Sequence, residues 1–325
     1  MSAVIWATVL FGSLLPMGMT GATQKGRVAL ENRESEGRLR VLIDGREAFV
    51  YQYGASLDMP HYWPLATPGG RNLLVRQTEP YPHHRSFWFA DTVRRPGGRD
   101  VSLYNGLYSG VEQPTEPKTY KPPFRDHIRH VRFGKLEARG GRAEIEAELA
   151  WEMDGSTALV TETRRLVVHA LGGGEYLLDL EFVLVPAGGE VEFRSDEVHY
   201  AWPFLRLQTP WSGEGGGRLT ADNGAAGQEA TNLRVAKWMD YSNTAEGETA
   251  GVAVFQYPDG FNHRWLTREY GCFGPRRPDA LSGKPFVLAP GMSLRQRVGV
   301  LVHSGDVKGG RVAERYQDYL GGRGK

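Results

Sequence analysis

The segment 82–91 holds the densest group of side chains that could do chemistry. It reads Pro-His-His-Arg-Ser-Phe-Trp-Phe-Ala-Asp, so two imidazoles, a guanidinium and a carboxylate surround three aromatic rings. Imidazoles exchange protons near neutral pH, a guanidinium binds oxyanions, and flat aromatic rings pack against sugars. This combination is typical of a pocket for a carbohydrate. A rim loop with solvated histidines and buried aromatic rings would have the same composition, so that alternative stays open.

Alternation along an extended chain places these side chains on two faces. His83 and Arg85 share one face, and His84 and Trp88 share the other. We predict His84 as a catalytic residue, and His83, Arg85 and Trp88 as substrate-binding residues.

A second group lies at 196–206, directly after a predicted strand. Glu197 and His199 share a face if the chain is extended, so they could act as a base and an acid, or the carboxylate could orient the imidazole. We predict both as catalytic residues, and Arg206 as a substrate-binding residue. The alternative is a strand end in which Trp202 and Phe204 are core and the charges are exposed.

A third group, at 262–271, combines a histidine, two arginines and aromatic rings. Arginine can fork a carboxylate or a diol, and a tryptophan ring can stack on a sugar face. From this group we predict four substrate-binding residues: His263, Trp265, Arg268 and Glu269. Alone it would be an ordinary surface strand, but loops from one end of a sandwich converge. We therefore expect residues 83–85 and 197–206 to line one pocket.

The charge balance argues against a nucleic-acid partner. The 325 residues carry 39 basic and 38 acidic side chains, a net charge of +1, and no polybasic run. The electrostatic footprint of a nucleic-acid-binding protein is therefore missing. We expect a small-molecule or oligosaccharide ligand instead.

No metal and no organic cofactor is predicted. Cys272 is the only cysteine, which excludes an intrachain disulfide and any Cys-based zinc or iron–sulfur site. Nine histidines are present, but no His-Glu-x-x-His motif or calcium loop organises them. The chain also has no nucleotide-binding glycine motif and no Gly-x-Ser-x-Gly nucleophile elbow.

The amino terminus is typical of an export signal. An uncharged, largely apolar run at 3–19 precedes the small residues Thr20, Gly21 and Ala22, which suit a cleavage site. We predict a signal peptide at 1–22 and an exported mature chain, periplasmic or secreted. An uncleaved anchor is the alternative. No other stretch approaches the ~20 apolar residues of a membrane helix, so we expect no transmembrane span in the mature chain.

Beyond residue 27, apolar and polar residues alternate with a period of two, the pattern of half-buried strands. Between 143 and 152 every second residue is Ala, Ile, Leu or Trp, and most of the others are Glu. Asp-Gly pairs at 44–45 and 154–155 supply tight turns. Strands are predicted at 39–43, 47–53, 143–152, 158–169, 175–185, 190–194, 250–257, 284–288 and 294–303, and one helix at 310–320.

These elements predict an all-β protein: an antiparallel β-sandwich or super-sandwich of roughly fifteen to twenty strands, with a short carboxy-terminal helix. No self-similar period of ~40–50 residues is present, which disfavours a propeller. No linker rich in Pro, Gly and Ser divides the chain. We therefore predict a single β-sandwich domain over 23–325.

Two stretches carry a resemblance to a known family. Residues 82–90 resemble the His-His-Arg-[Ser/Gly]-Leu-Trp-Phe-Ala-His signature of bacterial proteins described as methane oxygenase PmoA-like, and 62–70 are similar to that family's Tyr-x-Pro-Leu-x-x-Pro-x-Gly lead-in. Further similarities at 151–164, 237–242, 265–271 and 300–306 extend the resemblance over 28–320. Particulate methane monooxygenase subunits are membrane proteins, so copper oxygenase chemistry is not carried over to this chain.

The sequence departs from that family at its centre. Where the family has Lys-Glu-Gly-x-Phe-Gly-x-Arg, this chain has Glu-Val-His-Tyr-Ala-Trp-Pro-Phe-Leu-Arg at 197–206, and Asp91 replaces a common His. This difference makes His199 a stronger catalytic candidate than Glu197. It also favours a divergent branch of the family with a different substrate.

The general pattern also resembles the galactose-mutarotase super-sandwich. In that fold an early His/Arg pair, a central His and a later carboxylate surround a sugar ring. The residues in comparable order here are His83, His84 and Arg85, then His199, then Glu269. This is a likeness of fold, and function has to be argued from the site itself.

Two functions from different classes fit the sequence. The first is an exported carbohydrate-active enzyme that works by acid–base chemistry without an organic cofactor: an epimerase, a lyase or a hydrolase. The second is a non-catalytic carbohydrate-binding or accessory protein that uses the same aromatic rings and cations only to bind. A pH profile with two ionisations would favour the first, and binding without turnover would favour the second.

Overall fold

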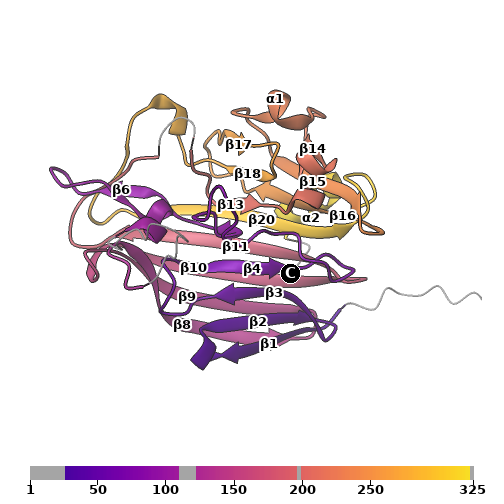
Figure 1. The fold of residues 1–325 in the computed structure, drawn as a ribbon, viewed down its shortest axis with the longest axis horizontal. Helices are drawn as coiled ribbons and strands as arrows, with labels where there is room; N and C mark the ends of the chain where they lie inside the picture. The colour runs from indigo at the N-terminus through magenta and orange to yellow at the C-terminus, as the bar shows by residue number, and fades with distance from the viewer. Residues whose placement is uncertain (1–25, 110–121, 196–198, 323–325) are drawn as a thin grey trace, which may run out of the picture.

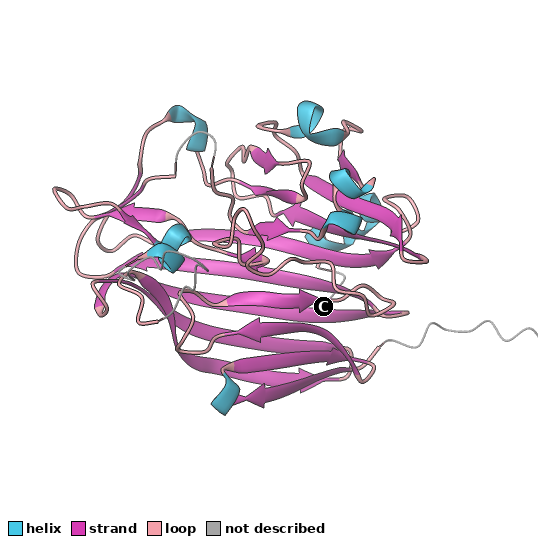
Figure 2. Cartoon of the chain, viewed as in Figure 1, coloured by secondary structure: helices cyan, strands magenta, loops and turns pink. Residues whose placement is uncertain are grey.

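The computed structural model describes residues 26–109, 122–195 and 199–322. Within these ranges twenty strands form three antiparallel sheets (Figure 1). Strands dominate the cartoon, whereas the helices are short and lie at the periphery (Figure 2). The predicted all-β sandwich with a short carboxy-terminal helix is therefore confirmed.

The first large sheet has eight strands, in the spatial order β1-β2-β3-β4-β5-β13-β18-β17. Their bounds are β1 Val28–Arg33, β2 Arg38–Ile43, β3 Arg46–Gln52, β4 His61–Leu65, β5 Phe87–Trp88, β13 Phe204–Arg206, β18 Cys272–Pro275 and β17 Trp265–Thr267.

The second large sheet also has eight strands, in the order β14-β15-β16-β20-β11-β10-β9-β8. Their bounds are β14 Arg218–Ala221, β15 Trp238–Ala245, β16 Glu248–Gln256, β20 Leu294–Ser304, β11 Glu175–Pro186, β10 Thr157–Gly172, β9 Arg142–Met153 and β8 His127–Arg139.

The remaining elements are smaller. A four-stranded sheet has the order β19-β12-β6-β7, with bounds β19 Phe286–Leu288, β12 Val191–Phe193, β6 Thr92–Arg94 and β7 Val101–Ser102. The α-helices are α1 Gly227–Thr231 and α2 Val312–Leu320. Single-turn or longer 3-10 helices span Glu34–Glu36, Leu103–Tyr108, Thr209–Trp211, Gly213–Gly215 and Ala280–Ser282.

Local sequence explains the regular hairpins. Asp44 and Gly45, which join β2 to β3, both have positive φ angles, of 52° and 78°. A two-residue turn with both φ values positive matches the right-handed twist of the flanking strands, and Asp-Gly tolerates it. In β9, the apolar residues of the alternating pattern are buried, and Ile145 pairs with Leu166 of β10. The predicted hairpin and strand are thus both confirmed.

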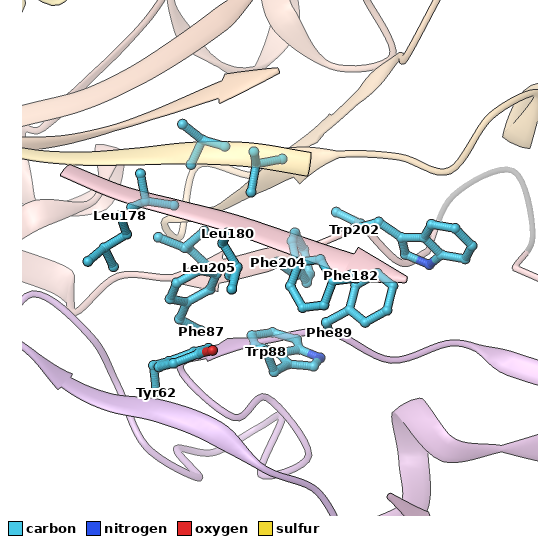
Figure 3. Close-up of a cluster of buried hydrophobic side chains, with 14 of the residues drawn as sticks. Tyr62, Phe87, Trp88, Phe89, Leu178, Leu180, Phe182, Trp202, Phe204 and Leu205 are labelled. Carbon is cyan, nitrogen blue, oxygen red and sulfur yellow. The ribbon is translucent and has the colours of Figure 1, made fainter. Parts of the chain in front are cut away.

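The main core lies between the two large sheets (Figure 3). Leu178 and Phe182 of β11 face Phe87 of β5 and Phe89, which directly follows it. The rings of Phe89 and Phe182 stack with centroids 4.0 Å apart. Burial of one such side chain contributes about 1.5–3 kcal/mol. These contacts fix β5 in place, so the opposite face of β5 is available to build a site.

The second sheet is covered on its outer face as well. Tyr316 and Tyr319 of α2 lie against Phe255 of β16, with ring centroids 5.5 and 5.8 Å apart. Leu177 and Leu301 belong to the same cluster. Because these strands are buried on both faces, they contain continuous apolar runs instead of alternation.

None of the described helices is long and apolar enough to cross a membrane. The predicted signal at 1–22 lies outside the described residues, and the single domain over 23–325 stays a prediction.

Candidate functional site

A cavity of about 480 Å³ lies beside the short strands of the first sheet. Four segments wall it: the loop before β5, the 3-10 helix Leu103–Tyr108, the approach to β13, and the β17–β18 region. The wall residues, in chain order, are Tyr81, His83, His84, Tyr104, Asn105, His199, Tyr200, Phe204, Leu266, Arg268 and Tyr270. The volume lies within the range usual for small-molecule sites.

Strand alternation places a layer of side chains directly behind the cavity wall around His84. Trp88 of β5 pairs with Phe204 of β13, and Arg206 of β13 pairs with Cys272 of β18. Neighbouring residues such as Phe87 point to the core, so these four side chains project from the other face of the sheet. All four contact the ring of His84.

The His-His pair does not lie in an extended segment. The backbone N–H of His84 donates to the carbonyl of Tyr81 at 3.0 Å, which makes a turn, and Ser86 has a positive φ of 89°. The two imidazole rings therefore lie 4.6 Å apart and both line the cavity. The prediction that alternation separates His83 from His84 was wrong because the turn replaces the strand.

His84 is a neutral imidazole held from several sides. Its ring stacks between Tyr81 and Trp88, with centroids 5.1 and 5.3 Å away. Burial, together with the charges of His83 and Arg206, lowers its pKa to about 2. Nη1 of Arg206 lies 3.4 Å from Nδ1 of His84. A guanidinium only donates, so Nδ1 accepts and the ring proton is on Nε2.

His83 is also neutral at physiological pH. Burial, then the charges of Arg206 and Arg85, lowers its pKa to about 4. Its Nδ1 lies 2.9 Å from the hydroxyl of Tyr108. Nε2 of His83 makes no hydrogen bond to a described residue and is therefore the ring atom left for a ligand.

Arg206 lies directly behind the wall and is buried. Nη1 donates to the carbonyls of Thr78 and Tyr81 at 3.1 and 3.4 Å. Its guanidinium carbon lies 5.5 Å from the ring centres of both Tyr81 and Tyr270. Cation–π contacts of this kind stabilise a charge in an aromatic environment. Arg206 thus organises the wall and places a positive charge beneath it.

The tyrosines supply the polar groups of the aromatic wall. Burial raises the pKa values of Tyr104 and Tyr270, so both phenols stay protonated and can donate. Tyr104 packs edge-on against Tyr200, with ring centroids 4.1 Å apart. The cavity therefore combines flat apolar faces with neutral hydrogen-bonding groups.

His199 and Arg268 complete the wall. The carbonyl of His199 accepts a hydrogen bond from Nη2 of Arg276 at 2.8 Å, and Nη1 of Arg268 donates to Oδ1 of Asn232 at 3.0 Å. The described wall residues include no Asp or Glu. Glu197, which was predicted as a catalytic residue, lies outside the described residues.

The structure thus brings His83, His84, His199 and Arg268 to one cavity. Trp88 and Arg206 lie behind that wall, in contact with His84.

Arg85 does not line the cavity with its neighbours. It is buried and forms an ion pair with Asp58. The chain bends next to Arg85, since Ser86, between Arg85 and β5, has a positive φ of 89°. Its predicted role in substrate binding does not fit this placement.

The third predicted group separates in the same way. Trp265 is fully buried and its Nε1 donates to the carbonyl of Ala236 at 2.9 Å. His263 is buried, 2.8 Å from a carboxylate oxygen of Asp259. The exposed carboxylate of Glu269 accepts from the backbone N–H of Gln228 at 3.3 Å. None of the three lines the cavity. Along β17 and the turn after it, the alternate residues Leu266, Arg268 and Tyr270 face the cavity, so Trp265 and Glu269 point elsewhere.

Sequence reasoning missed the tyrosines and Asn105. Tyr81 immediately precedes the segment 82–91, so its position in the sequence could have identified it as a candidate site residue. Tyr104 and Asn105 come from a 3-10 helix whose sequence, Leu-Tyr-Asn-Gly-Leu-Tyr, shows no motif. Tyr270 lies within the third group at 262–271 but was not among the binding residues predicted from it.

Across the described ranges, no three His, Cys, Asp or Glu side chains lie where they could hold a metal ion. The expectation of no metal and no cofactor stays a prediction.

Several solved structures are similar to this chain at a low level. The α-galactosidase AgaB of Geobacillus stearothermophilus is 10% identical, with a TM-score of 0.48, over 87% of this chain and 42% of that one. An α-galactosidase from Lactobacillus brevis is 9% identical, with a TM-score of 0.42, over 88% and 39%. A galactose mutarotase related enzyme from Lactobacillus acidophilus is 12% identical, with a TM-score of 0.29, over 86% and 98%.

This chain therefore spans less than half the length of the two α-galactosidases. Identities and TM-scores at these levels transfer neither an activity nor a ligand. No curated protein matches the chain. The resemblance to the PmoA-like family is not confirmed. A family model matches residues 38–317, and the chain belongs to that family, described as a family of unknown function (DUF6807).

Proposed function

We propose that the cavity binds a carbohydrate ring and that the protein acts on it by acid–base chemistry, as an epimerase, a lyase or a hydrolase. The observation that carries this proposal is the wall itself. Faces of Tyr81, Tyr104 and Tyr270 surround a 480 Å³ space in which neutral imidazoles and protonated phenols converge. Sugars present apolar C–H faces and hydroxyl rims, so they match stacked rings combined with many donors and acceptors.

His83 is the group proposed to move the proton. Its Nδ1 is held by Tyr108, and its pKa of about 4 leaves the ring unprotonated and able to accept at neutral pH. Tyr104 or Tyr270 can donate, because burial keeps each phenol protonated. The Nε2–H of His84 serves as a hydrogen-bond donor to a developing oxyanion. His84, which the sequence predicts as a catalytic residue, is thus proposed to act as a hydrogen-bond donor and not as a base, since its free lone pair faces Arg206.

The test is turnover of a panel of plant and algal oligosaccharides by the purified protein and by two matched variants. His83→Gln removes the proposed base. His130→Gln is the control, because His130 also has a pKa lowered to about 4 and an Nδ1 close to a tyrosine hydroxyl, that of Tyr51 at 3.4 Å. His130 lines a different groove.

Loss of a proton-transfer group lowers turnover ~10²–10⁴-fold. We expect that loss for His83→Gln with little change in KM, and no loss for His130→Gln. Equal turnover by both variants would remove His83 from the mechanism.

The second candidate is a carbohydrate-binding protein without turnover. One observation favours it: the pKa values of His83 and His84, about 4 and 2, lie far below neutral pH, where proton transfer is most effective. Saturable binding of an oligosaccharide with no product after long incubation would establish this candidate and displace the first.

Export belongs to the same proposal. The apolar run and the small residues before position 23 support a cleaved signal. Amino-terminal sequencing of the protein from its native host should find Thr23 at or near the start, and an intact Met1 in a cytoplasmic fraction would contradict export.

A further inference from the structure

The cavity sits over a positive charge that no described carboxylate compensates. Arg206 is 6% exposed, and its side-chain partners are two carbonyl oxygens, the Nδ1 of His84 and two aromatic faces. Its Nε has no hydrogen-bond partner among the described residues. A guanidinium is always charged, and burying a charge without a counter-charge is costly.

Two other buried arginines have carboxylate partners, whereas the buried Arg277 donates to the hydroxyl of Ser195 and to backbone carbonyls. Arg85 is paired with Asp58, and Arg164 is paired with Glu162 at 2.6 Å. Both pairs lie in the core, where a structural role suffices. Arg206 differs because three residues that it contacts, His84, Tyr81 and Tyr270, line an open cavity.

The described wall adds to the positive charge. Arg268 lines the cavity directly, and the other ionisable side chains on the described wall are histidines and tyrosines, which are neutral or cationic near neutral pH. A neutral sugar would leave the charge of Arg206 without a counterpart in the bound state. A ligand that brings its own anion would supply one.

We propose that the ligand of this cavity is an acidic sugar that carries a carboxylate on the ring, a uronic acid residue. This inference rests on the proposed function, because it names the class of sugar that the same cavity takes. A carboxylate in the cavity would bring a negative charge close to the guanidinium of Arg206, which lies directly behind the wall and is always charged. The charge of the carboxylate also interacts with Arg206 in an environment of lower dielectric than water.

A carboxylate on the sugar also provides an acidic C–H bond for the proposed base, His83, to act on. The hydrogen on the carbon next to a carboxyl group is the one that a lyase or epimerase removes. Neutralising the carboxylate by nearby arginines stabilises the negative charge that develops when this C–H bond breaks. The proton goes to Nε2 of His83, and the electron pair goes into the carboxylate group.

The experiment compares matched pairs of sugars that differ only in charge. Oligosaccharides of glucuronate, galacturonate and mannuronate are titrated into the full chain by calorimetry, each beside its methyl ester and beside a sulfated oligosaccharide of the corresponding neutral sugar. We expect at least one acid to bind roughly tenfold or more tightly than its ester, the size of a hydrogen bond to a charged group. Its binding should weaken as the salt concentration rises.

Variants identify the cation responsible. Arg206→Gln should abolish the preference for the acid over the ester, and Arg206→Lys should retain part of it. Arg295→Gln is the control, because Arg295 is an exposed arginine paired with Glu181 on the second large sheet. Thermal melting checks that each variant folds. If Arg206→Gln does not fold, the comparison of acid and ester with its salt dependence in the native protein still decides.

The outcomes separate this inference from the proposed function. Equal binding of acid and ester overturns the acidic-sugar inference and leaves a carbohydrate site. Preference for the sulfated sugar over the carboxylated one also overturns it. If no sugar of any charge binds, the proposed function itself fails.

Discussion

Nη1 of Arg206 lies 3.4 Å from Nδ1 of His84, although 122 positions separate the two residues in the chain. The contact fixes the tautomer of the imidazole, because arginine can only donate. It also couples the loop before β5 to strand β13, whose residue Phe204 pairs with Trp88. The relationship leaves the N–H of the His84 ring on Nε2.

The first prediction concerns this tautomer. In the native protein His84 should show no titration between pH 5 and 8, with its proton on Nε2, because its pKa is lowered to about 2. In Arg206→Gln the pKa of His84 should rise but remain below its ordinary value, since burial is the larger cause. Nitrogen chemical shifts of the labelled imidazole measure both quantities. A His84 that titrates near 6.5 in the native protein would refute the assignment.

The second prediction concerns the buried pair of Arg85 and Asp58, whose side chains are 2% and 0% exposed. Asp58→Asn should lower the free energy of unfolding by about 3–5 kcal/mol, because it leaves an uncompensated buried charge. Chemical denaturation measures the change. Glu181→Gln is the control: it breaks the pairs with Arg295 and Arg165, whose side chains are 62% and 48% exposed, and should cost about 1 kcal/mol or less. Similar losses in both variants would show that the buried pair of Arg85 and Asp58 contributes no more to stability than an exposed pair does.

The regular part of the fold could be predicted from the sequence. Strand β9, found at Arg142–Met153, was expected at 143–152 because one face is buried and the other is rich in Glu. Helix α2, at Val312–Leu320, followed from its apolar spacing. Strands β5 and β13 have two and three residues, all buried, so they leave no alternation to detect. Their positions depend on partners far away in the chain.

The site was predictable only in part, for a similar reason. The histidine pair was identifiable from residue types, but the turn that brings both rings to one cavity depends on the positive φ of Ser86, which serine seldom adopts. Trp265 has the residue type of a sugar platform and is fully buried in the structure. Composition identified candidate chemistry, and tertiary contacts decided which side chains face the ligand.

The third prediction tests the packing around His303. A Cβ on Gly310 would collide with the ring of His303, whereas a Cβ on Gly189 would meet nothing within 4 Å. Neither glycine has a positive φ, so steric space alone decides the effect. Gly310→Ala should lower the free energy of unfolding by about 1–3 kcal/mol, the usual cost of overpacking. Gly189→Ala should be neutral or slightly stabilising in the same urea titration. A neutral Gly310→Ala would mean that the His303 ring moves freely.

The last prediction concerns the pH dependence that the pair of His303 and Asp240 gives to stability. The two side chains are fully buried, with Nε2 of His303 2.7 Å from a carboxylate oxygen of Asp240. Burial acts to lower the pKa of His303, but the hydrogen bond and charge of Asp240 outweigh it and raise the pKa above its ordinary value. The folded state therefore holds this proton more tightly than the unfolded chain does. The stabilisation is fully present below about pH 6.5, the ordinary value of histidine, and is lost as the pH rises through the raised value.

His303→Gln should accordingly reduce the free energy of unfolding most at pH 6 and progressively less above it, measured by urea denaturation at a series of pH values. His130 provides a control of opposite sign. Burial lowers its pKa to about 4, so its protonation favours the unfolded chain as the pH falls below about 6.5. His130→Gln should therefore gain stability relative to the native protein as the solution is acidified. Parallel curves for the native protein and His303→Gln from pH 6 to 9 would show that the proton of His303 contributes nothing to folding.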